Sequence, residues 1–144
     1  MQYNTIDTKD FYTSAIFWQA LKNQALQVRN IQEALNDRLA LKDYGDGLKA
    51  IAFVPIAQLS DNQNHPEELK FSKKDKTLTM RLKLDYDSVA EANETRFLQL
   101  TAQLFLRGLH EAPQEKITDF DWAQFQHDAE QVFMEKGWVN AAEA

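Results

Sequence analysis

The stretch Thr77-Leu78-Thr79-Met80-Arg81-Leu82-Lys83-Leu84-Asp85-Tyr86 alternates strictly between polar and apolar side chains. Successive side chains of a β-strand point to opposite faces, so this pattern predicts one buried face and one wet face, as in an antiparallel sheet. Just upstream, the segment 69–72 and the charged turn 73–76 predict the other half of a hairpin that spans 69–86.

Further upstream, apolar side chains recur about every 3.6 residues instead of every two, as in an α-helix. A long amphipathic helix is predicted that ends before the turn sequence Tyr44-Gly45-Asp46-Gly47, with Gly45 as a left-handed C-cap. Its apolar stripe consists of Leu21, Ala25, Val28, Ile31, Leu35 and Leu39, and Gln27 falls on its polar side. The apolar run 48–54, stopped by Pro55, predicts a strand whose proline lies at its end or on an edge. The aromatic and β-branched segment 11–18 is typical of a strand covered on both faces or of the entry to a helix, and we favour one more strand over 10–16.

Downstream of the hairpin, capping residues mark where helices begin. Ser88 opens a short helical turn, and Asn93 caps a helix over 94–110 that we expect to lie on the sheet as the most buried helix. A final helix begins at Asp121, with Gln124 at the capping-box position, and ends at Gly137.

These elements predict one α+β domain over residues 1–144, with loose termini at 1–9 and 140–144. The predicted order is β-α-β-β-β-α-α. We expect a mostly antiparallel sheet of about four strands with helices packed on one face.

Composition removes several classes of function. With 144 residues, 44% of them hydrophobic, the chain is long enough for one folded core. The absence of cysteine excludes disulfide scaffolds, thiolate metal sites and cysteine nucleophiles. The start of the chain has no basic and apolar segments typical of a secretory signal, and no run reaches about 18 apolar residues, so we expect no membrane partner and a cytoplasmic location.

Charge is distributed unevenly along the chain. The formal net charge is −6, yet residues 70–83 carry six basic side chains against one acidic one. Residues 111–136 carry seven acidic side chains against two basic ones. The basic hairpin is set in an otherwise acidic chain and its lysines suit a protected sheet edge, so we do not expect a nucleic-acid partner. The acidic segment favours a basic protein partner.

The residues that could carry chemistry have ordinary structural explanations. The four glycines form no phosphate-binding loop, and the three histidines form no ligand pattern. Asp119 and Asp121 could form a catalytic pair, but the start of a helix accounts for both. Asp128 borders an apolar stripe, which predicts a structural salt bridge to Arg81 or Arg107, or else exposure at a binding surface. We therefore expect no catalytic residue, no metal and no cofactor.

Several short segments resemble a family of bacterial immunity proteins from polymorphic toxin systems, immunity protein 44. They include the turn 44–47, the strand end 53–56, the hairpin segments 70–76 and 80–86, and the helix after Asn93. The resemblance closes with Phe120, Asp121, Phe125 and Asp128, so that it spans 44–133.

This resemblance implies a protein that binds a cognate toxin and blocks it without catalysis. A basic toxin such as a nuclease would suit an acidic inhibitor. The expected partner-binding surface is the exposed side of the last helix and its approach: Glu115, Asp119, Asp128, Glu130 and Glu135. Two other interpretations remain: a generic protein-interaction or adaptor domain, and a small hydrolase that uses two carboxylates of raised pKa in a deep pocket.

Overall fold

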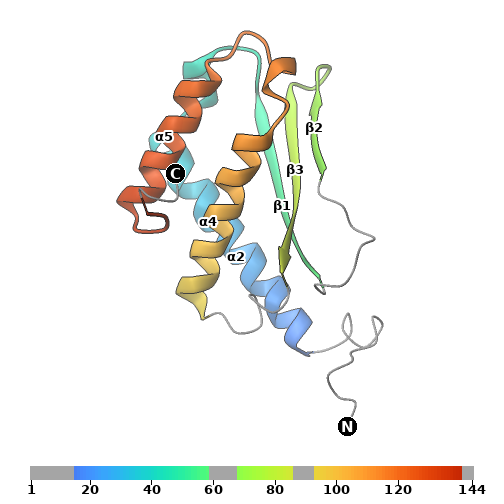
Figure 1. Ribbon diagram of the computed structural model, residues 1–144, viewed down its shortest axis with the longest axis vertical. Coiled ribbons are helices and arrows are strands. Elements are labelled where there is room, and N and C mark those ends of the chain that lie inside the picture. Colours follow the sequence, from blue (N-terminus) through green and yellow to red (C-terminus); the bar gives the residue numbers. More distant parts are fainter. Residues whose placement is uncertain (1–14, 59–67, 86–92, 141–144) are drawn as a thin grey trace.

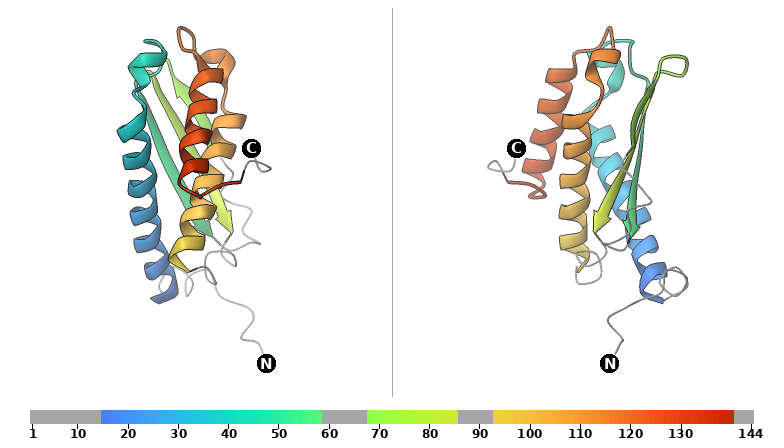
Figure 2. Two further views of the ribbon diagram at one scale, coloured as in Figure 1. Left: turned by 90° about the vertical axis from the view of Figure 1, so that its left-hand side faces the viewer. Right: turned by 45° about the vertical axis from the view of Figure 1, so that its right-hand side comes forward.

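A three-stranded sheet carries the described helices on one of its faces (Figure 1, Figure 2). The computed structural model describes residues 15–58, 68–85 and 93–140. The elements in chain order are α2 (Ala15–Arg38), the 3-10 turn η1 (Leu41–Tyr44), β1 (Ala50–Gln58), β2 (Glu68–Ser72), β3 (Thr77–Asp85), α4 (Glu94–Glu111), the 3-10 turn η2 (Gln114–Lys116) and α5 (Trp122–Glu135). The predicted α+β class, with helices on one face, is confirmed.

The sheet differs from the predicted one in size and direction. Within the described residues it has three strands rather than four, in the order β1-β3-β2. β3 pairs in parallel with β1 from Ala50↔Thr77 to Gln58↔Asp85, and antiparallel with β2 from Glu68↔Arg81 to Ser72↔Thr77. The sheet is therefore mixed, and the prediction of a mostly antiparallel sheet is wrong.

The reason lies in which strand of the hairpin takes the centre. β1 and β3 are both nine residues long, whereas β2 has five. The longer hairpin strand can pair along the whole of β1, and it then lies parallel to β1 with β2 on its far side. Alternation along the sequence correctly predicts the hairpin but does not say which of its strands meets β1.

The first predicted strand is also wrong. Of residues 10–16, Ala15 and Ile16 lie in helix α2, and 10–14 fall outside the described residues. The observed order is therefore α-β-β-β-α-α, with two 3-10 turns. Helix α2 starts earlier than predicted and ends at Arg38. Gly45 caps η1 rather than the long helix, with φ 137° and ψ −179°, which is not the left-handed helical conformation.

The buried side of α2 is rotated relative to the predicted stripe. Ile31 and Leu35 are buried as expected, but Ala25 is exposed. Gln27, predicted on the polar side, is completely buried, and its Oε1 accepts a hydrogen bond from Asn30 Nδ2 at 3.0 Å. A buried amide is costly unless its hydrogen bonds are satisfied, so helical periodicity alone would not place it in the core.

The hydrophobic core lies between the sheet and the helices. Leu78, Met80 and Leu82 of β3 are at most 1% exposed, and the intervening Arg81 is exposed, so the predicted alternation of faces is confirmed. Helix α4 lies on this face as predicted: a Cβ added at Gly108 would be 2.8 Å from side-chain atoms of both Leu82 and Met80. Glycine thus lets the helix approach β3 closely.

Most predicted boundaries agree with the structure. The strand predicted over 48–54 is an exception: β1 begins at Ala50 and continues through Pro55 to Gln58, so the predicted stop at the proline is wrong, although Pro55 does lie in an edge strand, one of its two predicted places. Asn93 and Asp121 cap α4 and α5, accepting hydrogen bonds from the backbone N–H groups of Arg96 and Gln124. The helical turn expected at Ser88 and most of the two expected loose termini lie outside the described residues. Among the described helices, none is long and apolar enough to cross a membrane.

The assignment of the two faces of β1 can be tested with neighbouring residues. Phe53 is 5% exposed and packs edge-on against Phe105 of α4, whereas Val54 is 41% exposed on the opposite face. Phe53→Ala should lower the free energy of unfolding by about 3–5 kcal/mol because it leaves a cavity in the core. Val54→Ala should cost less than about 1 kcal/mol in the same urea titration. Equal losses would contradict the assignment of faces.

Candidate partner-binding site

The turn after η1 is joined by backbone hydrogen bonds to the segment that leads into α5. Gly45 and Phe120 form an antiparallel bridge. The N–H of Asp121 donates to the carbonyl of Tyr44 at 2.8 Å, and the N–H of Gly47 donates to the carbonyl of Asp119 at 2.9 Å. Residues 44–47 and 118–121, which we call the backbone clamp, thus fix where α5 begins.

Both glycines of the clamp are needed for this close approach. A Cβ at Gly45 would lie 2.1 Å from the carbonyl oxygen of Asp119, and a Cβ at Gly47 would lie 1.6 Å from that of Thr118. Backbone atoms cannot move aside as a flexible side chain can, so a larger residue would separate the two strands of the clamp. The Tyr-Gly-Asp-Gly sequence is therefore a packing requirement of the fold.

Aromatic side chains fill the space beneath the clamp. The ring of Tyr44 packs edge-on against Phe125, with 5.3 Å between centroids, and lies 5.9 Å from Phe120. Phe120 and Phe125 contact each other and Trp122, with centroids 5.6–6.1 Å apart. Tilted and edge-on arrangements are favourable for aromatic pairs, so this cluster stabilises the start of α5.

Asp128 is held by neutral partners rather than by an arginine. Its Oδ2 accepts a hydrogen bond from the Tyr44 hydroxyl at 2.6 Å, and its Oδ1 accepts one from Gln124 Nε2 at 2.8 Å. The predicted salt bridge is wrong, since Arg81 pairs with Glu68 and Arg107 with Glu111. The hydrogen bond from Tyr44 lowers the pKa of Asp128, with a smaller contribution from Gln124. Burial, followed by the hydrogen bond to Asp128, raises the pKa of Tyr44 well above its usual value.

The other predicted binding residues lie in separate surroundings. Glu115 is exposed in η2, and Asp119 is exposed with φ 55° in the clamp. Glu135 is exposed and forms a 2.7 Å ion pair with Arg38 of α2. Glu130 is half-buried and lines a pocket between α4 and α5. The structure therefore does not gather Glu115, Asp119, Asp128, Glu130 and Glu135 into one pocket.

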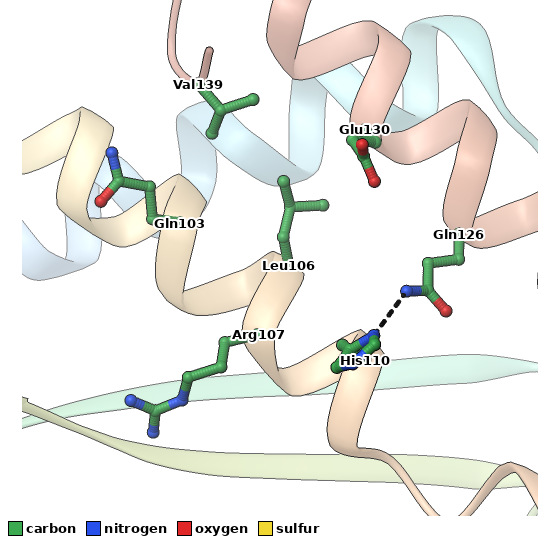
Figure 3. A pocket seen from close by; sticks show the side chains of 7 residues that line it. All are labelled: Gln103, Leu106, Arg107, His110, Gln126, Glu130 and Val139. Carbon is green, nitrogen blue, oxygen red and sulfur yellow. Dashed lines mark hydrogen bonds between the residues drawn. The ribbon is translucent and has the colours of Figure 1, made fainter. Parts of the chain in front are cut away.

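The pocket beside Glu130 has a volume of about 400 Å³. Helix α4 and helix α5 supply its two sides (Figure 3). Its lining residues are Gln103, Leu106, Arg107, His110, Gln126, Glu130 and Val139. Across the pocket, Gln126 Nε2 lies 3.4 Å from His110 Nδ1. The described residues of the lining thus combine one carboxylate, one guanidinium, one imidazole, two amides and apolar carbon.

Sequence reasoning found only one residue of this pocket. It could not pair the residues of α4 that line the pocket with those of α5. Helical periodicity says which residues share a face, whereas the pairing of faces depends on how α5 is positioned, here through the clamp. Gln126 and Val139 carried no recognisable signal.

The pocket does not have the composition that the hydrolase interpretation requires. Glu130 is the single carboxylate among the described residues that line it, so two converging carboxylates are not found there. Within the described part of the chain, no group of three or more His, Cys, Asp or Glu side chains could hold a metal ion. The arrangement is suited to binding a polar or charged group.

Comparison with known proteins gives one match. The model of a family described as immunity protein 44 matches residues 9–135. The matched range includes every described helix and strand. No curated protein and no solved structure matches the chain.

The close backbone contact in the clamp predicts that one added methyl group at Gly47 strongly destabilises the protein. Gly47→Ala should lower the free energy of unfolding by more than about 2 kcal/mol, because the new Cβ meets a backbone oxygen. Gly137→Ala is the control, since its Cβ would meet nothing within 4 Å and only its φ of 76° disfavours alanine. That variant should lose about 1 kcal/mol. A smaller loss for Gly47→Ala than for Gly137→Ala would argue against the close approach.

The hydrogen bond between Tyr44 and Asp128 predicts a dependence of stability on pH. Tyr44→Phe should cost about 1–2 kcal/mol near neutral pH, because a charged acceptor loses its donor. A carboxyl whose pKa is lowered by folding stabilises the protein above its unfolded pKa of about 3.9, and this contribution disappears as the pH falls through the folded value. The difference between the two proteins in urea unfolding should therefore shrink below about pH 4. A difference independent of pH would contradict this role of the hydrogen bond.

Proposed function

Because this chain belongs to the immunity protein 44 family, we propose that it neutralises a cognate bacterial toxin by binding it directly. The observation that carries the proposal is the family match over residues 9–135. Immunity proteins in general act without catalysis, and we extend this to the present chain. The action would take place in the cytoplasm, where an incoming or newly made toxin meets its inhibitor.

The charge of the C-terminal segment supports a basic toxin, of which a nuclease is one example. Residues 111–136 have a net excess of five acidic side chains. Glu115 and Asp119 are exposed, so their charges act on an approaching partner, whereas the charge of the exposed Glu135 is partly compensated by its ion pair with Arg38. Asp128 is held by Tyr44, but its lowered pKa keeps it ionised and adds to the same negative field. Such a field accelerates encounter with a positively charged protein.

This proposal gives the predicted residues two kinds of role. Exposed carboxylates such as Glu115 and Asp119 attract the toxin over a distance, and they need not touch it in the complex. The half-buried Glu130 stands at a pocket and can make a direct contact. The first role affects the rate of association and the second the rate of dissociation.

The direct test is neutralisation in living cells. The toxin encoded beside the gene for this chain should stop growth when it is expressed alone. Co-expression of the chain should restore growth, and the two proteins should purify as one complex. Gly47→Ala should fold poorly and therefore should not restore growth, which shows that rescue requires the folded protein. Failure to rescue together with failure to form a complex would refute the proposal, and stable capture of a housekeeping complex instead would favour an adaptor domain.

Attraction by the acidic segment predicts a specific kinetic change. Glu115→Lys with Glu135→Lys should slow association about three- to tenfold at low salt and flatten its salt dependence, without changing dissociation. Glu33→Lys with Asp37→Lys makes the same change in net charge at exposed positions of α2 and should have the smaller effect. Surface plasmon resonance at several salt concentrations measures both. Equal effects of the two pairs would contradict attraction localised at the acidic segment.

A further inference from the structure

We infer that the pocket between α4 and α5 is a socket for one arginine or lysine side chain of the toxin. The inference rests on the proposed function, and it names the contact that would hold the complex together. Glu130, the paired cations beside it and the apolar part of the pocket wall all suit such a guest.

Glu130 differs from the other acidic residues of its neighbourhood in having no partner among the described residues. Glu135 is paired with Arg38, Glu111 with Arg107, and Asp128 with Tyr44 and Gln124. Glu130 is also half-buried, and it faces a cavity. A carboxylate in such surroundings gains more from a cation than an exposed carboxylate does, because water screens the pair less.

The cationic groups of the pocket do not oppose such a guest. Arg107 Nε lies 3.2 Å from a carboxylate oxygen of Glu111, so its charge is already compensated. In Figure 3 its side chain also extends away from Glu130. His110 lies beside Gln126, whose amide can donate to a neutral imidazole. Among the described residues that line the pocket, Glu130 thus carries the negative charge that no neighbouring side chain compensates.

The rest of the wall suits a long side chain. Leu106 and Val139 offer apolar carbon beside Glu130 (Figure 3), as the methylene stem of arginine or lysine requires. The amides of Gln103 and Gln126 contain carbonyl oxygens that can accept from a guanidinium or ammonium group. An anionic guest would meet the charge of Glu130, and a wholly apolar guest would leave this carboxylate buried without a partner.

Dissociation kinetics distinguish a socket from general attraction. Glu130→Gln and Glu135→Gln remove the same charge from the same helix and should slow association of the toxin to a similar, small extent. Only Glu130→Gln should also accelerate dissociation, by about tenfold, because it removes a desolvated contact. Equal dissociation rates in the two variants would overturn the socket and leave the proposed function intact.

A second pair of variants blocks the pocket without changing the charge. Leu106→Trp should fill the cavity and accelerate dissociation of the toxin about tenfold. Ala123→Trp, at an exposed position of α5 outside the pocket, should leave dissociation unchanged. Thermal unfolding of both variants shows whether each is folded. A folded Leu106→Trp variant that holds the toxin as tightly as the unaltered protein would also overturn the socket.

A probe that does not depend on the toxin separates the two proposals. N-acetyl-arginine methylamide at about 10 mM, a concentration suited to a fragment of this size, should shift the NMR signals of the Leu106 and Val139 methyl groups in the unaltered protein. The shifts should saturate, and they should be absent in Glu130→Gln. Their absence in the unaltered protein would refute the socket, whereas a toxin that forms no complex at all would refute the proposed function.

Discussion

The rest of the structure depends on the close backbone contact between residues 44–47 and 118–121. Two glycines allow it, because any Cβ at Gly45 or Gly47 would meet a carbonyl oxygen of the facing strand. The contact joins the turn after α2 to the residue that caps α5, although more than 70 residues separate them in the chain. Three aromatic rings, of Phe120, Trp122 and Phe125, then pack beneath it, and the hydrogen bond from Tyr44 to Asp128 fixes the second turn of α5.

This constraint also accounts for the pocket. Helix α4 is placed independently, since its close approach at Gly108 seats it on Met80 and Leu82 of β3. Helix α5 is placed by the clamp and by the contact of Phe133 with Phe105. The pocket is the space left between the outward sides of the two helices, so neither helix alone defines it. A change in the clamp should therefore alter binding at Glu130 even though the two sites share no residue.

Much of the fold could be predicted because it depends on local patterns. Alternation along 77–86 correctly predicts the hairpin, and the capping residues Asn93 and Asp121 correctly mark the starts of α4 and α5. The errors concern choices that local patterns do not determine. Segment 10–16 has residue types common in strands, but Ala15 and Ile16 continue a long helix, and the parallel pairing of β1 with β3 depends on strand length. A structural salt bridge was one of two predictions for Asp128, but its partner Tyr44 is 84 residues distant and uncharged, so charge pairing pointed to the wrong residues.

The uneven charge of the chain takes a spatial form in the structure. By their register, Lys70 and Arg81 belong to the face of the sheet opposite to the buried Met80 and Leu82. Helix α5 lies on the other side of the sheet (Figure 2). Glu68 lies 3.7–3.8 Å from both of these basic side chains and reduces their field. On α5, by contrast, Glu130 has no partner among the described residues. Most of the basic charge of the hairpin remains, but it lies on the side of the sheet away from α5, so a positively charged partner would be drawn to the helical side.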